Sequence, residues 1–262
     1  MASGSVGLAL LITTLAGLAT AIGSLLALAL KPANRWALSL ALGFSAGAML
    51  FISFVELLPS AAGEFGGGVH GTWLALGAFL AAFAATAALD VLMPDEPRGQ
   101  AETLSGQRAT PVRAGLFVAA AVAIHNVPEG MATFFLTLDQ AAVGISVAVA
   151  IALHNIPEGI AVSAPVLAAT GSRAKAFGIS VASGLAEPAG AVVAFLFLAP
   201  FLSPTLFGVF SAAAAGLMVY VAVHQILSMA HREEMPRPVV IGVFAGMGLM
   251  GASMALLGLA MR

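Results

Sequence analysis

Two short segments place groups that can bind a metal ion inside long apolar runs. The first reads AIHNVPEGMA over 123–132, and the second reads ALHNIPEGIA over 152–161. Each holds a histidine, an asparagine, a proline and a glutamate in the same order. Imidazole nitrogen and carboxylate oxygen together suit Zn, Fe(II), Mn, Co or Ni, whereas Ca and Mg sites use oxygen alone. The duplicated pattern therefore predicts a site for divalent transition metals.

Helical spacing brings the ligand groups of each segment onto one face. The histidine precedes the glutamate by four residues in both segments, so the two side chains lie one turn apart. The proline leaves the carbonyl four residues earlier without its donor and bends the helix. If the segments lie on antiparallel neighbours, they meet at similar depth and form one centre for two ions. Its candidate ligands are His125, Asn126, Glu129, His154, Asn155 and Glu158.

The composition predicts an all-α polytopic membrane protein. Of 262 residues, 60% are hydrophobic and 8% are charged, and the mean hydropathy is +1.04. A soluble domain carries about 25% charged residues, so most of this surface must face lipid. The net charge of −2 gives no reason to expect a nucleic-acid partner. The absence of cysteine excludes disulfides and thiolate metal sites.

Eight apolar runs have the length of roughly 20 residues that a membrane helix needs. We expect one transmembrane domain over 1–262, with a flexible cytoplasmic loop at 93–111. Nine of the ten Lys and Arg residues lie in alternate connections, and only Arg262 lies on the other side. By the positive-inside rule, both termini are then outside a bacterial plasma or inner membrane. The predicted spans are 5–30, 36–60, 71–92, 114–137, 141–169, 176–199, 205–230 and 238–261.

The carboxylates within these spans have no partner of opposite charge in the sequence. A charge at mid-bilayer costs at least ~2.5–3.5 kcal/mol, yet no Lys or Arg lies in the middle of any span. Glu129, Glu158 and Glu187 must therefore be protonated, hydrated or compensated by a bound cation. We expect Asp90 to be a solvated helix end. For His224, a core hydrogen bond and a role in the ion path remain equal alternatives.

The motifs in these spans resemble those of a known protein family. HNxPEG on two successive spans of an eight-span chain resembles the ZIP (Zrt/Irt-like) metal transporters, in their bacterial ZupT/GufA-type branch. SGLAEPAGA at 183–191 and FISFVELLPS at 51–60 are similar to the same branch. The resemblance implies inverted repeats of spans 1–3 and 6–8 around spans 4–5, a 3+2+3 arrangement. It also implies the following ligands: His125, Glu129, His154 and Glu158 for one ion; Asn126, Asn155 and Glu187, with bridging Glu129 and Glu158, for the other; and Glu56 near the outer mouth.

Two departures from the family pattern limit that inference. Many relatives carry a histidine-rich loop between spans 3 and 4, whereas 93–111 has no histidine. The seventh span reads VHQILS at 223–228, where relatives often have an acidic residue before LLP. Capture of metal by the loop, and an accessory third metal site, are therefore not expected. Glu56 lies close enough to the end of its span to reach water, which is an alternative to a role as ligand.

Together these observations predict a transporter that takes up Zn(II), and with it Fe(II), Mn(II), Co(II) or Cd(II), by alternating access. The ion is cargo, and no prosthetic group is expected. We expect spans 2, 4, 5 and 7 to carry the site. The alternatives are an intramembrane metal-dependent hydrolase and a metal-selective channel. HExxH hydrolases carry two histidines on one helix, which HNxPE lacks. Whether the chain forms a homodimer is left open.

Overall fold

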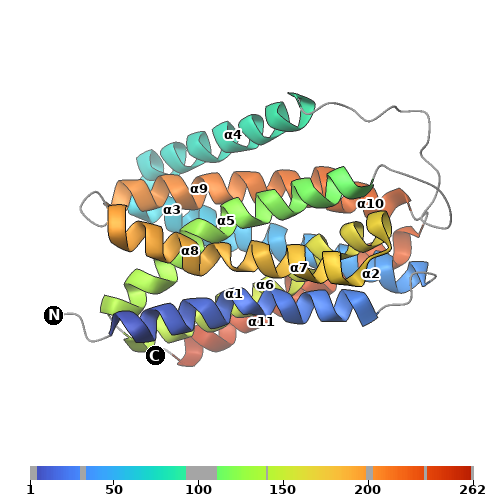
Figure 1. The fold of residues 1–262 in the computed structure, drawn as a ribbon. Helices are drawn as coiled ribbons and strands as arrows, with labels where there is room; N and C mark the ends of the chain where they lie inside the picture. Colours follow the sequence, from blue (N-terminus) through green and yellow to red (C-terminus); the bar gives the residue numbers. More distant parts are fainter. Residues whose placement is uncertain are drawn as a thin grey trace.

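The fold is a bundle of long helices (Figure 1). The computed structural model describes residues 5–29, 34–92, 111–139, 141–198, 203–232 and 235–260. These ranges contain helices and short turns but no strand, which confirms the all-α prediction. In chain order the elements are α1 (Val6–Ala29), α2 (Arg35–Ile52), η1 (Ser53–Leu57), α3 (Leu58–Glu64), α4 (Gly68–Leu92), α5 (Pro111–Asp139), α6 (Ala141–Thr170), α7 (Arg173–Gly184), α8 (Ala186–Val193), η2 (Ala194–Leu198), α9 (Pro204–Tyr220), η4 (Val221–Ile226), α10 (Leu227–Arg232) and α11 (Pro236–Ala260); the η segments are π-helical.

The helices agree with the predicted membrane spans. Seven stretches of the described chain are long and apolar enough to cross a bilayer, and they correspond to every predicted span except the fourth. That span is α5, whose 29 residues also exceed the roughly 20 that a crossing needs. The predicted loop at 93–111 lies outside the described residues, apart from Pro111, which begins α5.

Successive spans run in opposite directions. α2, α5, α7 and α11 begin at one end of the bundle, where α1, α4, α6 and α10 end (Figure 1). Arg35, Arg113, Arg173 and Arg237 lie in the first turns of those four helices. We call this the basic end. The described start of α1 and the described end of α11 lie at the opposite end (Figure 1). The alternating distribution of basic residues in the sequence therefore becomes a difference between the two ends of the bundle.

The way the helices pair follows the two-fold pattern expected of inverted repeats. α1 packs along α6, and α7 and α8 pack along α5. α2 packs along α11, and α9 packs along α4. Exchange spans 1–3 with spans 6–8, and span 4 with span 5. The contact of α1 with α6 then becomes the contact of α7 and α8 with α5, and the contact of α2 with α11 becomes the contact of α9 with α4. This is the packing that a 3+2+3 arrangement requires.

Glycines allow the closest of these approaches. On α2, Gly43 and Gly47 face the backbone of α11 at Val239 and Val243. A Cβ atom on either glycine would overlap with the carbonyl oxygen opposite. Small residues of this kind allow the backbones of membrane helices to come into van der Waals contact.

The largest apolar cluster lies on the basic-end side of the two HNxPEG segments. It joins α2, α5, α6, α9, η4 and α10. α5 begins at the basic end, so Val118 and Val122 precede His125 on that side. α6 ends there, so Ala161 and Val162 follow Glu158 on that side. Buried apolar side chains therefore separate these polar residues from the basic end.

A substitution at the α2–α11 contact tests this packing. We expect Gly47→Ala to lower the free energy of unfolding by about 1–3 kcal/mol, because the added methyl group has no space. Gly77→Ala on α4 is the matched control, because nothing lies within 4 Å of its added Cβ. Thermal unfolding in detergent measures both. If the two variants unfold at the same temperature, α2 and α11 are not in backbone contact.

Candidate metal centre

Three carboxylates, two amides and a histidine meet inside the bundle, on α5, α6 and α8. The exposed fraction is 0% for Glu158 and Glu187, 6% for Glu129 and 1% for His125. Asn126 and Asn155 are both fully buried. These are six of the eight ligands proposed from the sequence, and they come from three separate spans.

His125 connects the two HNxPEG segments. Its Nε2 atom lies 3.1 Å from Oε1 of Glu129, one turn along α5. The same nitrogen lies 3.2 Å from Oε1 of Glu158, on α6. The two glutamates therefore converge on one imidazole nitrogen, as expected for groups that can bind a common cation.

The two asparagines are held by their nitrogens, and their oxygens remain available. Nδ2 of Asn126 donates to the carbonyl of Ser183 at 3.1 Å. Nδ2 of Asn155 donates to the carbonyl of Ala16 at 2.8 Å and also to Oε1 of Glu187. Because a carbonyl accepts only, these bonds fix which end of each amide faces the backbone. The amide oxygen is then the end that can bind a metal.

Several buried oxygens in the cluster accept no hydrogen bond within the described part of the chain. A buried acceptor left in this state costs about 1–3 kcal/mol. A bound cation would compensate that cost, whereas a structural hydrogen-bond network would have satisfied the oxygens already. Among the described residues, no three His, Asp or Glu side chains are arranged around a single metal position. The oxygens in question are Oδ1 of Asn126, Oδ1 of Asn155, Oε2 of Glu158 and Oε2 of Glu187; Oε1 of Glu158 lies beside His125.

Prolines shape the helices where the cluster forms. Pro128 and Pro157 lie inside α5 and α6, and each lacks the N–H that would bond four residues back. Pro188 lies directly after Glu187, and the chain turns at Leu185, between α7 and α8. Both helices belong to the predicted sixth span, and together they form one stretch, Arg173–Phe197, that is long and apolar enough to cross a bilayer. The turn follows from the donor that Pro188 lacks, which leaves the Gly184 carbonyl outside the helical ladder.

Glycines next to the glutamates let the three helices approach each other. A Cβ on Gly130 would overlap with the backbone carbonyl of Glu187, and one on Gly159 would overlap with the carbonyl of Thr20 on α1. Ser45 of α2 donates its hydroxyl to the carbonyl of Pro157 at 2.7 Å. The support from α1 and α7, through backbone carbonyls, was not predicted, because a carbonyl leaves no signal in the sequence.

Two proposed ligands are not brought into the cluster by the described side chains. His154 lies on α6 one turn before Glu158, but its side chain is outside what the structure describes. Glu56 lies on the π-helical segment η1, which packs mainly against α2, α3 and α9. Single-turn π segments are frequent at functional sites. The ligand roles of both residues stay predictions.

Asp90 and His224 form a second polar contact, between α4 and η4. Oδ2 of Asp90 accepts a hydrogen bond from Tyr220 at 2.7 Å and from Gln225 at 3.2 Å. Nε2 of His224 lies 3.3 Å from the same oxygen, and the Asp90 side chain is only 19% exposed. The prediction that Asp90 is a solvated helix end is therefore wrong: side chains of the seventh span, rather than water alone, surround its carboxylate.

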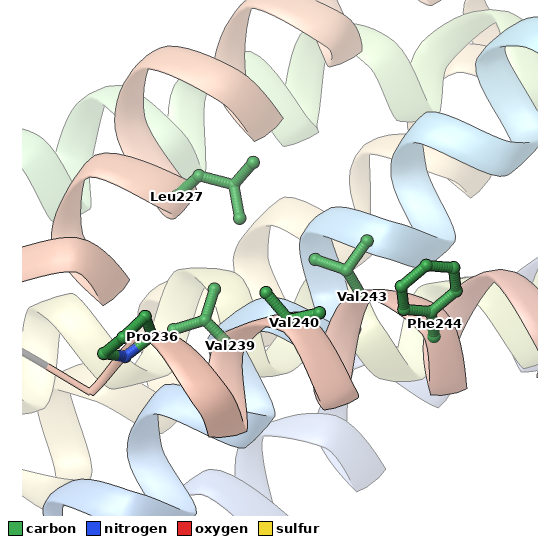
Figure 2. Close-up of a pocket in the computed structure, with 6 residues that line it drawn as sticks. All are labelled: Leu227, Pro236, Val239, Val240, Val243 and Phe244. Atoms are coloured by element: carbon green, nitrogen blue, oxygen red, sulfur yellow. The ribbon is translucent and has the colours of Figure 1, made fainter.

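An apolar groove of about 430 Å³ lies apart from these polar groups. Figure 2 shows Leu227 on α10 facing a row of side chains along α11, which includes Val240 and Phe244. None of these side chains offers an oxygen or nitrogen ligand. This apolar groove is therefore not the candidate cation site.

Comparison with known proteins shows the family of this chain. The model of the ZIP zinc transporter family matches residues 94–254. The chain belongs to the ZIP family. It is 48% identical to zinc transporter ZupT of Chlorobium phaeovibrioides, over 95% of this chain and 97% of that protein. It is also 45% identical to ZupT of Akkermansia muciniphila, over 92% and 94% of the two chains, and 40% identical to ZupT of Streptococcus mutans, over 95% and 97%.

ZIP membership confirms the resemblance found in the sequence and decides one alternative. A ZIP protein is a membrane transporter and not an enzyme, so the hydrolase reading is wrong. Spans 2, 4, 5 and 7, which we expected to carry the site, share the large apolar cluster. The third carboxylate of the polar cluster comes from α8 in the sixth span, and the amides are held from α1 and α7. Which spans hold the metal stays a prediction.

The charge of Glu158 can be tested through stability. We expect metal-free Glu158→Gln to unfold at the same or a higher temperature, because a buried carboxylate without a base costs several kcal/mol. Zinc at a hundredfold excess over its Kd should stabilise the parent by about 2.7 kcal/mol and the variant far less. Thermal unfolding with and without zinc measures this. Glu64→Gln, at an exposed position on α3, should respond to zinc as the parent does; an equal response of Glu158→Gln would contradict the site.

Proposed function

We propose that this chain takes up Zn(II), and related divalent ions, through the membrane into the cytoplasm. The single observation that carries the proposal is the buried set of carboxylate and amide oxygens in a sequence with no mid-span Lys or Arg. A travelling cation supplies the positive charge that the chain lacks. The relatives with matching length are named zinc transporters, which supports zinc as the main cargo. Fe(II), Mn(II), Co(II) and Cd(II) are further candidates from the ligand chemistry.

The proposed centre holds two ions. His125 and His154, with Glu129 and Glu158, bind the first ion. Asn126, Asn155 and Glu187 bind the second, and Glu129 and Glu158 bridge the two. The orientation of the amides supports this division, because the nitrogens of both asparagines are engaged elsewhere and leave oxygens for a metal. Glu56 would contribute near the outer mouth.

Transport requires access from both sides in turn. A fixed tight site would trap the ion, so the centre must open alternately to each face, as midplane sites on broken helices do in other transporters. The apolar cluster on the basic-end side supports this, because it separates the ligands from that end. If the basic end is cytoplasmic, as the positive-inside rule predicts, that cluster must part for the ion to leave. Both termini are then outside.

Removal of both bridging carboxylates should abolish transport. We expect Glu129→Ala, Glu158→Ala to reduce uptake of Zn, Fe, Mn, Cd and Co to background in proteoliposomes that contain only this protein. The parent should saturate at low metal concentration, because a carrier binds before it moves its cargo. Flux that rises without saturation would show a channel instead. Full uptake by the double variant would refute the centre.

Metal binding should weaken as the pH falls. The ligands bind a metal only as neutral imidazole and ionised carboxylate, so binding releases protons. Mass action then lowers the apparent affinity about tenfold per pH unit for each proton released. Radiometal uptake at several pH values, with and without a pH gradient, measures the effect. An apparent affinity independent of pH would count against these ligands. Glu64→Gln, whose charge lies outside the centre, should keep the pH dependence of the parent.

A further inference from the structure

Two buried threonines lie one helical turn from the metal centre, on the side away from the basic end. α5 runs away from the basic end, so Thr133, four residues after Glu129, lies about 6 Å farther from that end. α1 runs toward the basic end, so Thr13 lies four residues farther from it than Gly17, which packs against Glu187. Both threonines are 0% exposed.

A small apolar cluster lies next to the two threonines, on the side farther from the basic end. Ala9 of α1, Phe134 of α5 and Ala191 of α8 form that cluster. Thr13 lies between Ala9 and the level of Glu187 along α1, and Thr133 directly precedes Phe134 along α5. Both threonines are therefore buried about one helical turn from the level of the centre, on two of the helices that meet at Glu187.

Neither hydroxyl has a hydrogen-bond partner among the residues that the structure describes. The neighbouring threonines in the same two helices behave differently. Thr14 donates to the carbonyl of Leu10 at 2.7 Å, and Thr137 donates to the carbonyl of Thr133 at 2.7 Å. This bond to the carbonyl four residues back is the usual way for a helix to satisfy a threonine. Thr13 and Thr133 leave the bond unmade, although it is available to them.

A buried hydroxyl that donates to no protein group is suited to water or to the hydration shell of an ion. It can both donate and accept a hydrogen bond, and buried waters bind preferentially to such groups. We propose that Thr13 and Thr133 form a hydroxyl step next to the metal centre. The step holds the water shell of a divalent cation while the cation exchanges water for the ligands of the centre. This inference rests on the proposed transport function.

The hydroxyl step affects the rate at which the cation exchanges its waters for protein ligands. It does not affect the equilibrium affinity of the metal centre. A cation between bulk water and the centre must lose its waters one at a time, and each loss is easier where polar oxygens replace them. On the basic-end side, the buried hydroxyls of Ser24 and Ser163 bond to each other at 2.6 Å. The hydroxyl of Ser39, which has no hydrogen-bond partner among the described residues, lies six residues closer to that end than Ser45, which reaches the carbonyl of Pro157. The two threonine hydroxyls therefore favour exchange on the side away from the basic end, which the positive-inside rule makes the side of entry.

Valine substitutions separate this role from a structural one, because valine keeps the shape of threonine and removes only the hydroxyl. In zinc-loaded uptake assays with proteoliposomes, we expect Thr133→Val and Thr13→Val each to lower the maximal rate about tenfold, the effect of roughly 1.4 kcal/mol on a barrier. Equilibrium zinc binding should stay within about twofold of the parent, and the unfolding temperature should stay equal or rise, because an unpartnered hydroxyl is replaced by a methyl group.

Thr137→Val and Thr14→Val are the matched controls, since their hydroxyls bond to carbonyls of their own helices. Both should transport zinc at the rate of the parent. The inference is overturned if Thr13→Val and Thr133→Val transport like the controls, or if their loss of rate is matched by lost stability and lost zinc binding. A parent protein that carries no zinc at all would instead refute the transport function itself.

Discussion

The structure depends on one electrostatic constraint: three acidic side chains are buried in an apolar bundle beside a single histidine, with no mid-span Lys or Arg to neutralise them. Glu158 and Glu187 are completely buried, and the sequence offers no mid-span Lys or Arg. Burying an isolated charge is so unfavourable that an unpaired carboxylate must be neutralised by a proton or by another cation. A permanent ion pair would give a stable protein that cannot exchange its cation. Omitting the base keeps the cationic position open to a cargo.

The rest of the centre limits what else could satisfy these carboxylates. Pro128, Pro157 and Pro188 each interrupt a helical ladder close to a glutamate, and Gly130 and Gly159 bring neighbouring backbones into contact there. Backbone carbonyls of α1 and α7 then hold the amide nitrogens of the two asparagines. The helices around the centre thus use the donors of the polar side chains and leave acceptors unused. A surplus of acceptors attracts a cation and repels an anion, so the backbone contributes to selectivity for charge.

The spans and the residues of the buried polar cluster were predictable because their signals lie in local sequence. Hydropathy gave the helices, and the spacing of His125 and Glu129 gave a shared face that the structure confirms by a 3.1 Å contact. What could not be predicted depends on contacts between distant segments. The carbonyls of Ala16 and Ser183, which hold the two amides, leave no pattern in composition or periodicity. Asp90 was misread for the same reason, because its partners Tyr220 and Gln225 lie on a helix 130 residues away.

The surroundings of the centre are unequal on its two sides, and this inequality bears on the mechanism. Toward the basic end lies the largest apolar cluster, built from both halves of the chain. Toward the opposite end lie the hydroxyls of Thr13 and Thr133, which have no hydrogen-bond partner in the described part of the chain, and smaller apolar clusters around Phe134 and Ile151. A single rigid site with such walls would exchange ions with one side only. The helix contacts of the two halves correspond in pairs. The contact of α1 with α6 corresponds to that of α8 with α5, and the contact of α2 with α11 corresponds to that of α9 with α4. Under the alternating access proposed above, the two halves would take each other's packing in a second arrangement, and the closed side of the centre would then become the open one.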